Sequence, residues 1–416
     1  MQLSKFIFSL FFVATTAVFS QQKEITLEEI WGGTFSQERL ESLNSLKNGK
    51  EYIVVNQDRS AGTSSIDVYG YESGEKTGTL VNSAALEEIA RFQGYELSDD
   101  ESKILLGTQV EQIYRHSSRG IYFVYDIASK TLKKVTDKKI QEPTFSPNGT
   151  KIAYVHDNNL YVKDLASEEE IQITSDGKKN EIINGITDWV YEEEFAFVRA
   201  FGWNATGSKI AFLKFDEENV PEFGMDVYGD ELYPRADVFK YPKAGEENAN
   251  VSLHIYELST AETKDIALGE YEDFYIPRIN WTNDAEILSV QVLNRHQNEL
   301  DLIFVNTQKD EVKMVLQEVD KAYVDITDNL TFLADNSFIW TSEKDGWNHI
   351  YHYDKNGKLI NQITKGNWEV TNYYGFDPKS KTVFYQSTED GSVNRAVYSI
   401  SANGKNKKHL TEKEGT

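Results

Sequence analysis

Four stretches of this sequence repeat the same order of hydrophobic and polar positions. Each stretch starts with an aromatic residue, turns through polar, glycine or proline residues, and then enters an apolar run typical of a β-strand. The four stretches are 145–155, 203–213, 281–290 and 376–385. Segments with alternating side chains follow several of them, at 159–165, 252–258 and 349–354. Alternation places one set of side chains inward and the other toward water. The pattern therefore predicts an all-β protein built from repeated units.

A short pair of an apolar residue and a threonine closes several of the repeated units. Thr136 and Thr174 are 38 residues apart, and Thr364 and Thr411 are 47 apart. Repeats of roughly 40–50 residues with four strands each are typical of β-propeller blades, which bury their faces by stacking around an axis. Residues 43–416 are 374 residues long. Dividing this length by the repeat period predicts eight blades of four antiparallel strands. A β-sandwich is the alternative, but it would not repeat this unit four times.

Composition and charge limit the kind of partner. The chain carries 43 Lys and Arg against 67 Asp and Glu, and this formal net charge of −24 disfavours binding to nucleic acid. It contains no cysteine, which excludes disulfides, thiolate zinc sites and thiol nucleophiles. The acidic residues lack the ordered ligand spacing of a calcium-binding loop. We therefore expect neither a metal nor a cofactor.

The first twenty residues have the pattern of an export signal. Lys5 and the amino terminus form a short cationic start, and the fourteen residues 6–19 carry no charge. This run is shorter than the ~20 residues of a membrane-spanning helix, but it suits the core of a signal peptide. Compact side chains at Val18 and Ser20 predict cleavage before Gln21. We expect an exported chain, periplasmic or secreted, without a stable membrane span. An uncleaved amino-terminal anchor is the alternative.

One segment, 184–195, lacks the strand pattern. It contains three consecutive glutamates, Glu192, Glu193 and Glu194, which follow Asp188 at short distance. Asp188 can cap a helix by accepting the free amide hydrogen bonds of its first turn. Successive residues step about 100° around a helix, so three adjacent glutamates cannot share one face. Two of them can still converge on a small cation such as an ammonium group. The alternative is a solvated acidic turn.

The acidic segment closely resembles the double-glutamate segment of the dipeptidyl peptidase IV branch of the prolyl oligopeptidase family of serine peptidases. Further agreement lies in 114–117 (Tyr-Arg-His-Ser), 149–155, 161–163 and 241–245. The resemblance covers essentially the whole chain after the signal. It implies an eight-bladed propeller over an α/β-hydrolase domain. It also implies an enzyme that releases dipeptides from peptide amino termini after a penultimate proline or, less well, alanine.

The resemblance also implies roles for three residues. Glu193 and Glu194 match the two glutamates that bind the α-ammonium of the substrate. Arg115 matches the arginine that braces those glutamates and donates a hydrogen bond to a substrate carbonyl. Without the resemblance, Arg115 would be interpreted as a surface charge. Charge-assisted hydrogen bonds would hold the ammonium at a set distance from the nucleophile, so only the peptide bond two residues along would reach it.

The catalytic elements of that family are not found in the 416 residues. No Gly-x-Ser-x-Gly nucleophile motif occurs, and the seven histidines are scattered over predicted strands and loops. In the family, the hydrolase domain is carboxy-terminal to the propeller. We therefore expect this chain to be the amino-terminal part of a longer peptidase, inactive by itself because it lacks the Ser-Asp-His triad. We expect residues 21–42, with a short helix at 25–31, to pack against the missing hydrolase domain.

Two other functions stay open at this point. A prolyl tripeptidyl peptidase would share the acidic anchor and cut one residue further along. A stand-alone, non-catalytic propeller would bind peptide amino termini without a hydrolase domain. The Tyr-Arg-His-Ser segment and the three glutamates, occurring together, favour an enzyme whose partners are peptides with a free amino terminus and a penultimate proline or alanine. By resemblance, the region of Phe239, Tyr241 and Pro242 implies an arm between the subunits of a homodimer.

Overall fold

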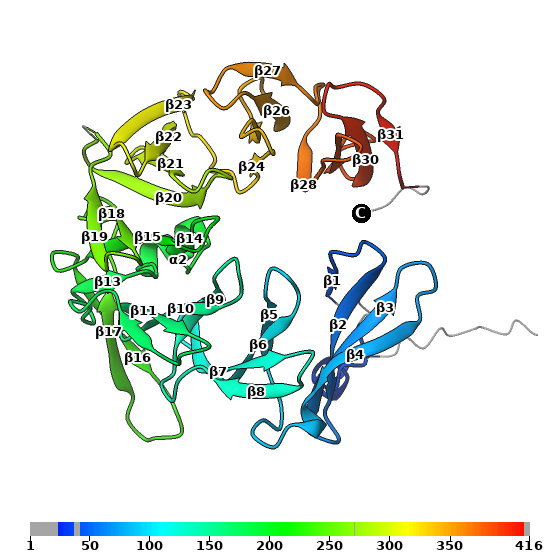
Figure 1. The fold of residues 1–416 in the computed structure, drawn as a ribbon, viewed down its shortest axis with the longest axis vertical. Coiled ribbons are helices and arrows are strands. Elements are labelled where there is room, and N and C mark those ends of the chain that lie inside the picture. The colour runs from blue at the N-terminus through cyan, green and yellow to red at the C-terminus, as the bar shows by residue number, and fades with distance from the viewer. Residues whose placement is uncertain (1–23, 37–41, 270, 412–416) are drawn as a thin grey trace, which may run out of the picture.

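The strands of the structure form a ring of sheets. The computed structural model describes residues 24–36, 42–269 and 271–411. Within these residues, seven sheets of four or five antiparallel strands follow one another around a central axis in chain order (Figure 1). Each sheet is a blade, numbered along the chain. The predicted all-β propeller is confirmed. The predicted signal peptide, residues 1–20, lies outside the described residues, and none of the described helices is long and apolar enough to cross a membrane.

Six of the blades are meanders of four strands in chain order. Blade 1 contains β1 (Leu43–Ser45), β2 (Glu51–Asp58), β3 (Thr63–Gly70) and β4 (Lys76–Asn82); blade 2 contains β5 (Gly94–Leu97), β6 (Lys103–Gln112), β7 (Ser118–Asp126) and β8 (Thr131–Lys134); blade 3 contains β9 (Gln141–Phe145), β10 (Lys151–His156), β11 (Asn159–Asp164) and β12 (Glu170–Gln172). Blade 5 contains β20 (Phe274–Trp281), β21 (Ile287–Asn294), β22 (Glu299–Asn306) and β23 (Glu311–Val319); blade 6 contains β24 (Thr331–Phe332), β25 (Phe338–Ser342), β26 (His349–Tyr353) and β27 (Leu359–Gln362); blade 7 contains β28 (Val370–Asp377), β29 (Thr382–Ser387), β30 (Ala396–Ser401) and β31 (Lys408–His409). Helix α1 (Leu27–Trp31), which confirms the short helix predicted at 25–31, precedes blade 1, and the 3-10 helix η1 (Ser83–Ala85) follows it.

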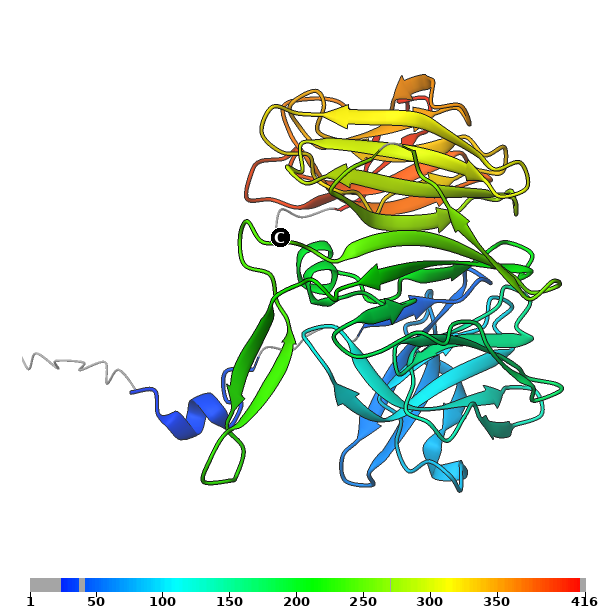
Figure 2. The same cartoon turned by 90° about the vertical axis from the view of Figure 1, so that its left-hand side faces the viewer.

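Blade 4 differs from the others because it carries two insertions. Its strands are β13 (Ile182–Asn184), β14 (Phe201–Trp203), β15 (Lys209–Asp216), β18 (Asn250–Glu257) and β19 (Glu262–Ile266). Helix α2 (Trp189–Phe195) lies between β13 and β14. A hairpin of β16 (Glu222–Val227) and β17 (Arg235–Lys240), called the arm, lies between β15 and β18. Figure 2 shows the arm extending from one face of the propeller, on the side where α1 is found.

The predicted number of blades is wrong, because the described residues form seven blades and not eight. Blade 4 occupies residues 182–266, close to twice the period of its neighbours. Helix α2 and the arm add chain to this unit without adding another sheet. Dividing the chain length by the repeat period counted those insertions as a further blade.

Each apolar–threonine pair lies just past the outermost strand of a blade. In blade 6, the N–H of Ile363 donates to the carbonyl of Ile350 (2.8 Å). The hydroxyl of Thr364 accepts a hydrogen bond from the N–H of the same Ile350 (2.9 Å). Thr174 in blade 3 and Thr411 in blade 7 accept the equivalent bond. The threonine thus satisfies a backbone group of the third strand at the point where the fourth strand ends, which explains why the pair recurs.

The core lies between successive blades. In β10, Ile152 packs into a cluster shared with blade 2, whereas its neighbour Ala153 packs into a cluster shared with blades 4 to 6. Ile339 and Trp340 in β25 divide in the same way between blade 7 and the earlier blades. Both faces of such a strand are covered by other blades, so its successive residues are all apolar. Among the described residues, no core cluster joins blade 7 to blade 1.

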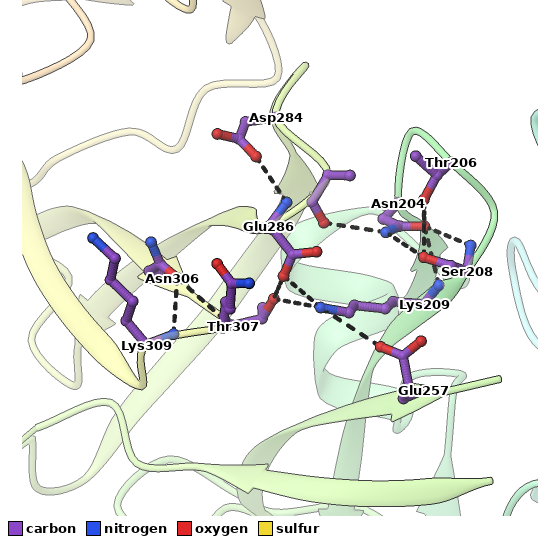
Figure 3. Close-up of polar contacts among 12 residues, drawn as sticks. Asn204, Thr206, Ser208, Lys209, Glu257, Asp284, Glu286, Asn306, Thr307 and Lys309 are labelled. Carbon is purple, nitrogen blue, oxygen red and sulfur yellow. Dashed lines mark hydrogen bonds and ion pairs between the residues drawn. The ribbon is translucent and has the colours of Figure 1, made fainter. Parts of the chain in front are cut away.

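A group of polar residues between blades 4 and 5, called the Lys209 cluster, ties these two sheets together (Figure 3). The side chain of Lys209 is 12% exposed and forms ion pairs with Glu286 and with Glu257 (3.6 Å). Its Nζ also donates to the hydroxyl of Thr307 (3.1 Å). Asn204 accepts a hydrogen bond from the N–H of Lys209 (3.0 Å) and donates to a carbonyl of blade 5 (3.1 Å). The ammonium of Lys209 is therefore paired on several sides.

Candidate functional site

Helix α2 carries the three glutamates and has the cap that the sequence predicts. Asp188 is the N-cap, and its Oδ1 accepts a hydrogen bond from the N–H of Tyr191 (2.9 Å). Ala196 adopts the left-handed conformation (φ 54°) and ends the helix after seven residues. Burial raises the pKa of Asp188 to about 6. The predicted short acidic helix is confirmed, and Figure 1 places it beside β14 on the inner side of blade 4.

Tyr191 fixes this helix to blade 5. Its ring is almost fully buried, and its hydroxyl accepts a hydrogen bond from the N–H of Ile276 in β20 (2.9 Å). The ring also lies edge-on to the rings of Phe215 (4.8 Å between centroids) and Tyr275 (5.9 Å). Edge-to-face packing of this kind adds to the stabilisation from burial alone. The helix is therefore held in one position relative to the two blades.

Glu192, the first of the three glutamates, serves the structure. It is 1% exposed, and its Oε1 accepts hydrogen bonds from the backbone N–H groups of His116 (2.7 Å) and Ser117 (2.8 Å). Those amides belong to the turn between β6 and β7, which also carries Arg115. The carboxylate therefore ties blade 2 to the helix of blade 4. The sequence alone predicts no role for Glu192. About 200° around the helix separates it from Glu194, so the two side chains point in different directions.

Arg115 and Glu193 form an ion pair although they are 78 residues apart in the chain. The Nε of Arg115 lies 2.8 Å from Oε2 of Glu193. The Glu193 side chain is 18% exposed and the Arg115 side chain is 70% exposed, so much of the guanidinium faces solvent. Gln112 stabilises the turn by donating to the carbonyls of Tyr114 (2.8 Å) and Arg115 (3.0 Å). The structure thus brings together two of the three predicted residues.

Glu194, the third predicted residue, is the most open of the glutamates. Its side chain is exposed, and no residue in the described part of the chain forms a hydrogen bond or ion pair with its carboxylate. Partial burial and the charges of Asp325 and Glu194 raise the pKa of Tyr323, which places this phenol near both carboxylates. Because Arg115 neutralises one carboxylate of the predicted pair, one negative charge is left. This balance suits a singly charged cation that donates hydrogen bonds.

Two cavities border these residues. One, of about 930 Å³, is lined by Tyr114 and Glu192, which are chain neighbours of the predicted residues, and by Glu217. Burial and the nearby charge of Asp188 raise the pKa of Glu217 to about 7. The other cavity, of about 640 Å³, lies between blades 5 and 6 and is lined by Tyr323. Among the residues that the structure describes, no group of three or more His, Asp or Glu is placed to hold a metal ion.

The base of the arm packs against the same helix. The ring of Trp189 in α2 lies 4.3 Å from the ring of Tyr241 and 6.4 Å from that of Phe239. Phe239 in turn lies 5.7 Å from the ring of Tyr114, the residue before Arg115. These aromatic contacts connect three segments that are distant in the chain. The helix, the arginine turn and the arm therefore form one packed unit.

The sequence of the chain matches the model of a known protein family. The sequence model of the family described as Dipeptidyl peptidase IV (DPP IV) N-terminal region matches residues 98–416. The chain is 30% identical over 438 residues to dipeptidyl-aminopeptidase B of Aspergillus niger, covering 94% of this chain and 48% of that protein. It is 29% identical over 404 residues to prolyl endopeptidase FAP of Homo sapiens, covering 91% and 51%. The chain thus spans about half the length of the curated relatives that it matches.

A solved structure agrees with these sequence matches. The crystal structure of Porphyromonas gingivalis dipeptidyl peptidase 4 superposes with a TM-score of 0.88 at 41% sequence identity. The match covers 94% of this chain and 56% of that chain. The resemblance predicted from the acidic segment is therefore confirmed at the level of sequence and of fold.

Proposed function

Because the chain belongs to the dipeptidyl peptidase IV amino-terminal region family, we propose that it is the propeller part of a secreted serine exopeptidase that releases Xaa-Pro or Xaa-Ala dipeptides. In this proposal, the acidic helix binds the α-ammonium of the substrate, and a carboxy-terminal hydrolase domain supplies the Ser-Asp-His triad. In the same proposal, the segment 21–42, of which the structure describes 24–36 and 42, would pack against that domain. The observation that supports the proposal is the ion pair between Arg115 and Glu193 beside the open carboxylate of Glu194.

An ammonium group between Glu193 and Glu194 would have two charged acceptors. Each charge-assisted hydrogen bond contributes about 1.5–3 kcal/mol net. With Arg115 present, the occupied site would hold two carboxylates and two cations, which leaves no uncompensated charge. The exposed part of the Arg115 guanidinium can donate to the carbonyl of the first substrate residue. Unlike the lysine of the Lys209 cluster, this cation keeps donors for a ligand.

The rigid support of the helix turns this binding into a selection for length. Asp188 caps α2, and the hydrogen bonds of Tyr191 and Glu192 hold the helix against blades 5 and 2. An ammonium bound there stays at a constant distance from the nucleophile of the hydrolase domain, so the second peptide bond is the one that reacts. A longer amino-terminal extension would collide with the helix. The same residues thus attract the correct substrate and exclude others.

The proposal also includes export and a homodimer. The amino-terminal pattern of residues 1–20 supports a periplasmic or secreted location. Tyr228, Leu232 and Tyr233 at the tip of the arm are exposed, and a second copy of the chain would cover this apolar surface. Sedimentation of the complete protein tests the dimer. The wild type should sediment as a dimer, and Tyr233→Asp should yield a monomer; a monomeric wild type would contradict the dimer.

Substitution of the glutamates in the complete protein tests the proposed activity. Glu194→Gln removes a charge with little change in shape and should lower kcat/KM for a chromogenic Ala-Pro substrate at least 30-fold, which corresponds to about 2 kcal/mol. Glu193→Ala and Glu194→Ala should abolish measurable release. Glu169→Gln, an exposed glutamate of blade 3, is the matched control and should keep full activity. Near-wild-type rates in either alanine variant would refute the assignment.

The same preparation separates the two alternatives. Chromogenic Ala-Pro and Ala-Ala-Pro substrates are assayed side by side, each with a free and an acetylated amino terminus. Cleavage of free Ala-Pro supports a dipeptidyl peptidase, and cleavage of free Ala-Ala-Pro alone indicates a tripeptidyl peptidase. If neither is cleaved, calorimetric binding of a peptide with a free amino terminus, and not of its acetylated form, indicates a non-catalytic propeller.

A further inference from the structure

A second group of carboxylates, called the acidic pocket, surrounds the cavity of about 640 Å³ between blades 5 and 6. The cavity is lined by the end of β23, by residues of the 320–329 loop and by the turn after β25. Four of its lining residues are acidic and form no ion pair with any Lys or Arg in the described part of the chain: Glu318, Asp320, Asp325 and Glu343. Such a pocket carries a strong negative charge beside apolar and aromatic walls.

The cations near the acidic pocket are fewer than its carboxylates, although the charge of Lys344 acts on Glu318. Lys344 is the one basic residue among the described lining residues. Its ammonium donates to the hydroxyl of Tyr353 and lies 4.0 Å over the ring of Tyr351. Asp328, a fifth carboxylate, accepts a hydrogen bond from Nη2 of Arg278 (3.0 Å) and is thereby compensated. The other four carboxylates therefore face one lysine, which leaves an excess of negative charge in the pocket.

Glu318 supplies a second observation that indicates a ligand. It is 9% exposed, and its Oε2 accepts a hydrogen bond from the hydroxyl of Ser342. Its Oε1 is buried and lacks a hydrogen-bond partner within the described residues. Burial raises the pKa of Glu318, and the indole Nε1 of the neighbouring Trp340 also lacks a hydrogen-bond partner within the described residues. A buried carboxylate oxygen is costly to leave without a donor, so a donor from a ligand would stabilise it.

The like charges around Glu343 support the same conclusion. Burial together with the charges of Asp325, Glu369 and Asp320 raises the pKa of Glu343. Repulsion between such carboxylates raises the free energy of the ionised pocket until a cation neutralises them. The acidic pocket is therefore suited to a cationic group.

Tyr323 connects the acidic pocket to the predicted ammonium site. Its half-exposed ring lines the pocket, and the charges of both Asp325 and Glu194 act on its hydroxyl. An amino-terminal residue whose α-ammonium is bound at Glu194 would carry its side chain on the adjacent α-carbon. An extended lysine or arginine side chain from that position can pass the face of Tyr323, where a cation is attracted to the ring.

We propose that the acidic pocket binds the cationic side chain of the first substrate residue, so that peptides beginning with lysine or arginine are preferred. The inference rests on the proposed function, because the pocket is placed relative to the substrate by the ammonium site. The pocket adds a preference for side-chain charge to a site that otherwise recognises only a free amino terminus and the residue after it. Specificity arises from attraction of basic residues and repulsion of acidic ones.

The test uses the complete protein and four chromogenic substrates: Lys-Pro, Arg-Pro, Ala-Pro and Glu-Pro. In the wild type, kcat/KM for Lys-Pro and Arg-Pro should exceed that for Ala-Pro by about tenfold, and Glu-Pro should be the poorest, as expected for one charge-assisted contact. The double variant Asp325→Asn with Glu343→Gln should reduce this preference to about twofold while leaving Ala-Pro within twofold of the wild type. Glu169→Gln is the control and should keep the full preference.

The outcomes distinguish this inference from the function on which it rests. Cleavage of Ala-Pro without any preference for basic residues would overturn the inference alone. An equal loss on all four substrates in the double variant would also overturn it, because the carboxylates would then support only the ammonium site. Failure to cleave any of the four would overturn the proposed function and the inference together. Raising the salt concentration, which needs no variant, should lower the Lys-Pro to Ala-Pro ratio; an unchanged ratio counts against the inference.

Discussion

The Lys209 cluster and the acidic helix both combine glutamates with one cation, but they differ in what is left unpaired. Lys209 is 12% exposed and pairs with one glutamate of blade 4, Glu257, and one of blade 5, Glu286. Arg115 is 70% exposed and pairs with Glu193, while Glu194 stays open. The first arrangement is closed on itself and joins two blades. The second keeps both an acceptor and free donors, which is what a binding site requires.

Whether a charged region contributes to stability or to binding depends less on the number of its charges than on their accessibility. Both regions lie on or beside blade 4, and both contain more carboxylates than cations. An enclosed lysine contributes to folding because its partners would otherwise be left partly buried and unpaired. An exposed arginine contributes little to folding, because solvent screens the pair. Substitutions should therefore affect stability in one region and activity in the other.

The largest effect on stability is expected from removing the support beneath the acidic helix. Glu192→Ala leaves the N–H groups of His116 and Ser117 buried without an acceptor and should lower the free energy of unfolding by about 2–4 kcal/mol. It should also free the turn that carries Arg115 and reduce kcat/KM for Ala-Pro at least tenfold. Urea unfolding and steady-state kinetics measure both. Glu192→Gln keeps one acceptor oxygen and should lose less; equal losses in the two variants would contradict this role.

The next effect concerns Arg115, the exposed cation beside the acidic helix. Arg115→Gln removes the positive charge beside Glu193 and should lower kcat/KM for Ala-Pro about 30-fold, equivalent to about 2 kcal/mol. The melting temperature should change little, because exposed ion pairs contribute at most about 1 kcal/mol. Kinetics and calorimetry on the complete protein check both statements. A large loss of stability with unchanged kinetics would reverse the distinction between the two regions.

The closed cluster should respond in the opposite way. Lys209→Met keeps most of the side-chain volume but leaves Glu286 and Glu257 without their cation, and should lower the free energy of unfolding by about 1–2 kcal/mol. Activity should stay within twofold of the wild type. Lys133→Met is the matched control, because the ion pair of Lys133 with Glu168 is exposed on both sides and its loss should cost less than about 0.5 kcal/mol.

The last effect depends on pH and concerns Glu217, a buried carboxylate that lines the same cavity as Glu192. Burial and the charge of Asp188 raise its pKa to about 7. A raised folded-state pKa means that its favourable contribution is fully present below the unfolded pKa and is lost as the pH rises through 7. Glu217→Gln should therefore match the wild type at pH 4 and be more stable at pH 8, by up to about 3 kcal/mol. Unfolding curves at both pH values check this, and equal stability at pH 8 would contradict it.

Local features of the fold were predictable from the sequence. The repeated aromatic-turn-strand units, the apolar–threonine pairs and the cap at Asp188 all depend on residues close together in the chain. The number of blades was not predictable by division, because helix α2 and the arm enlarge blade 4 without forming a sheet. A strand pattern identifies a strand, but it does not say in which sheet the strand is placed.

The candidate site was predictable only in part. The resemblance pointed to Arg115, Glu193 and Glu194, and the structure brings the first two within 2.8 Å. Their role with substrate stays a prediction. Glu192 and the acidic pocket were missed. The acidic residues of the pocket are spread from position 318 to 343, and no short spacing marks them as a group.

The sequence by itself determined the strand repeats, the capped helix and the family, because each is written in neighbouring residues or in a motif. Only the tertiary structure decided which charged side chains are enclosed and paired and which are exposed and available to a ligand. That outcome depends on contacts between residues 75 to 78 positions apart, such as Glu192 with Ser117 and Glu193 with Arg115. Burial and pairing of a charge are properties of the packed blades, since the same glutamate is structural when enclosed and available to a ligand when exposed.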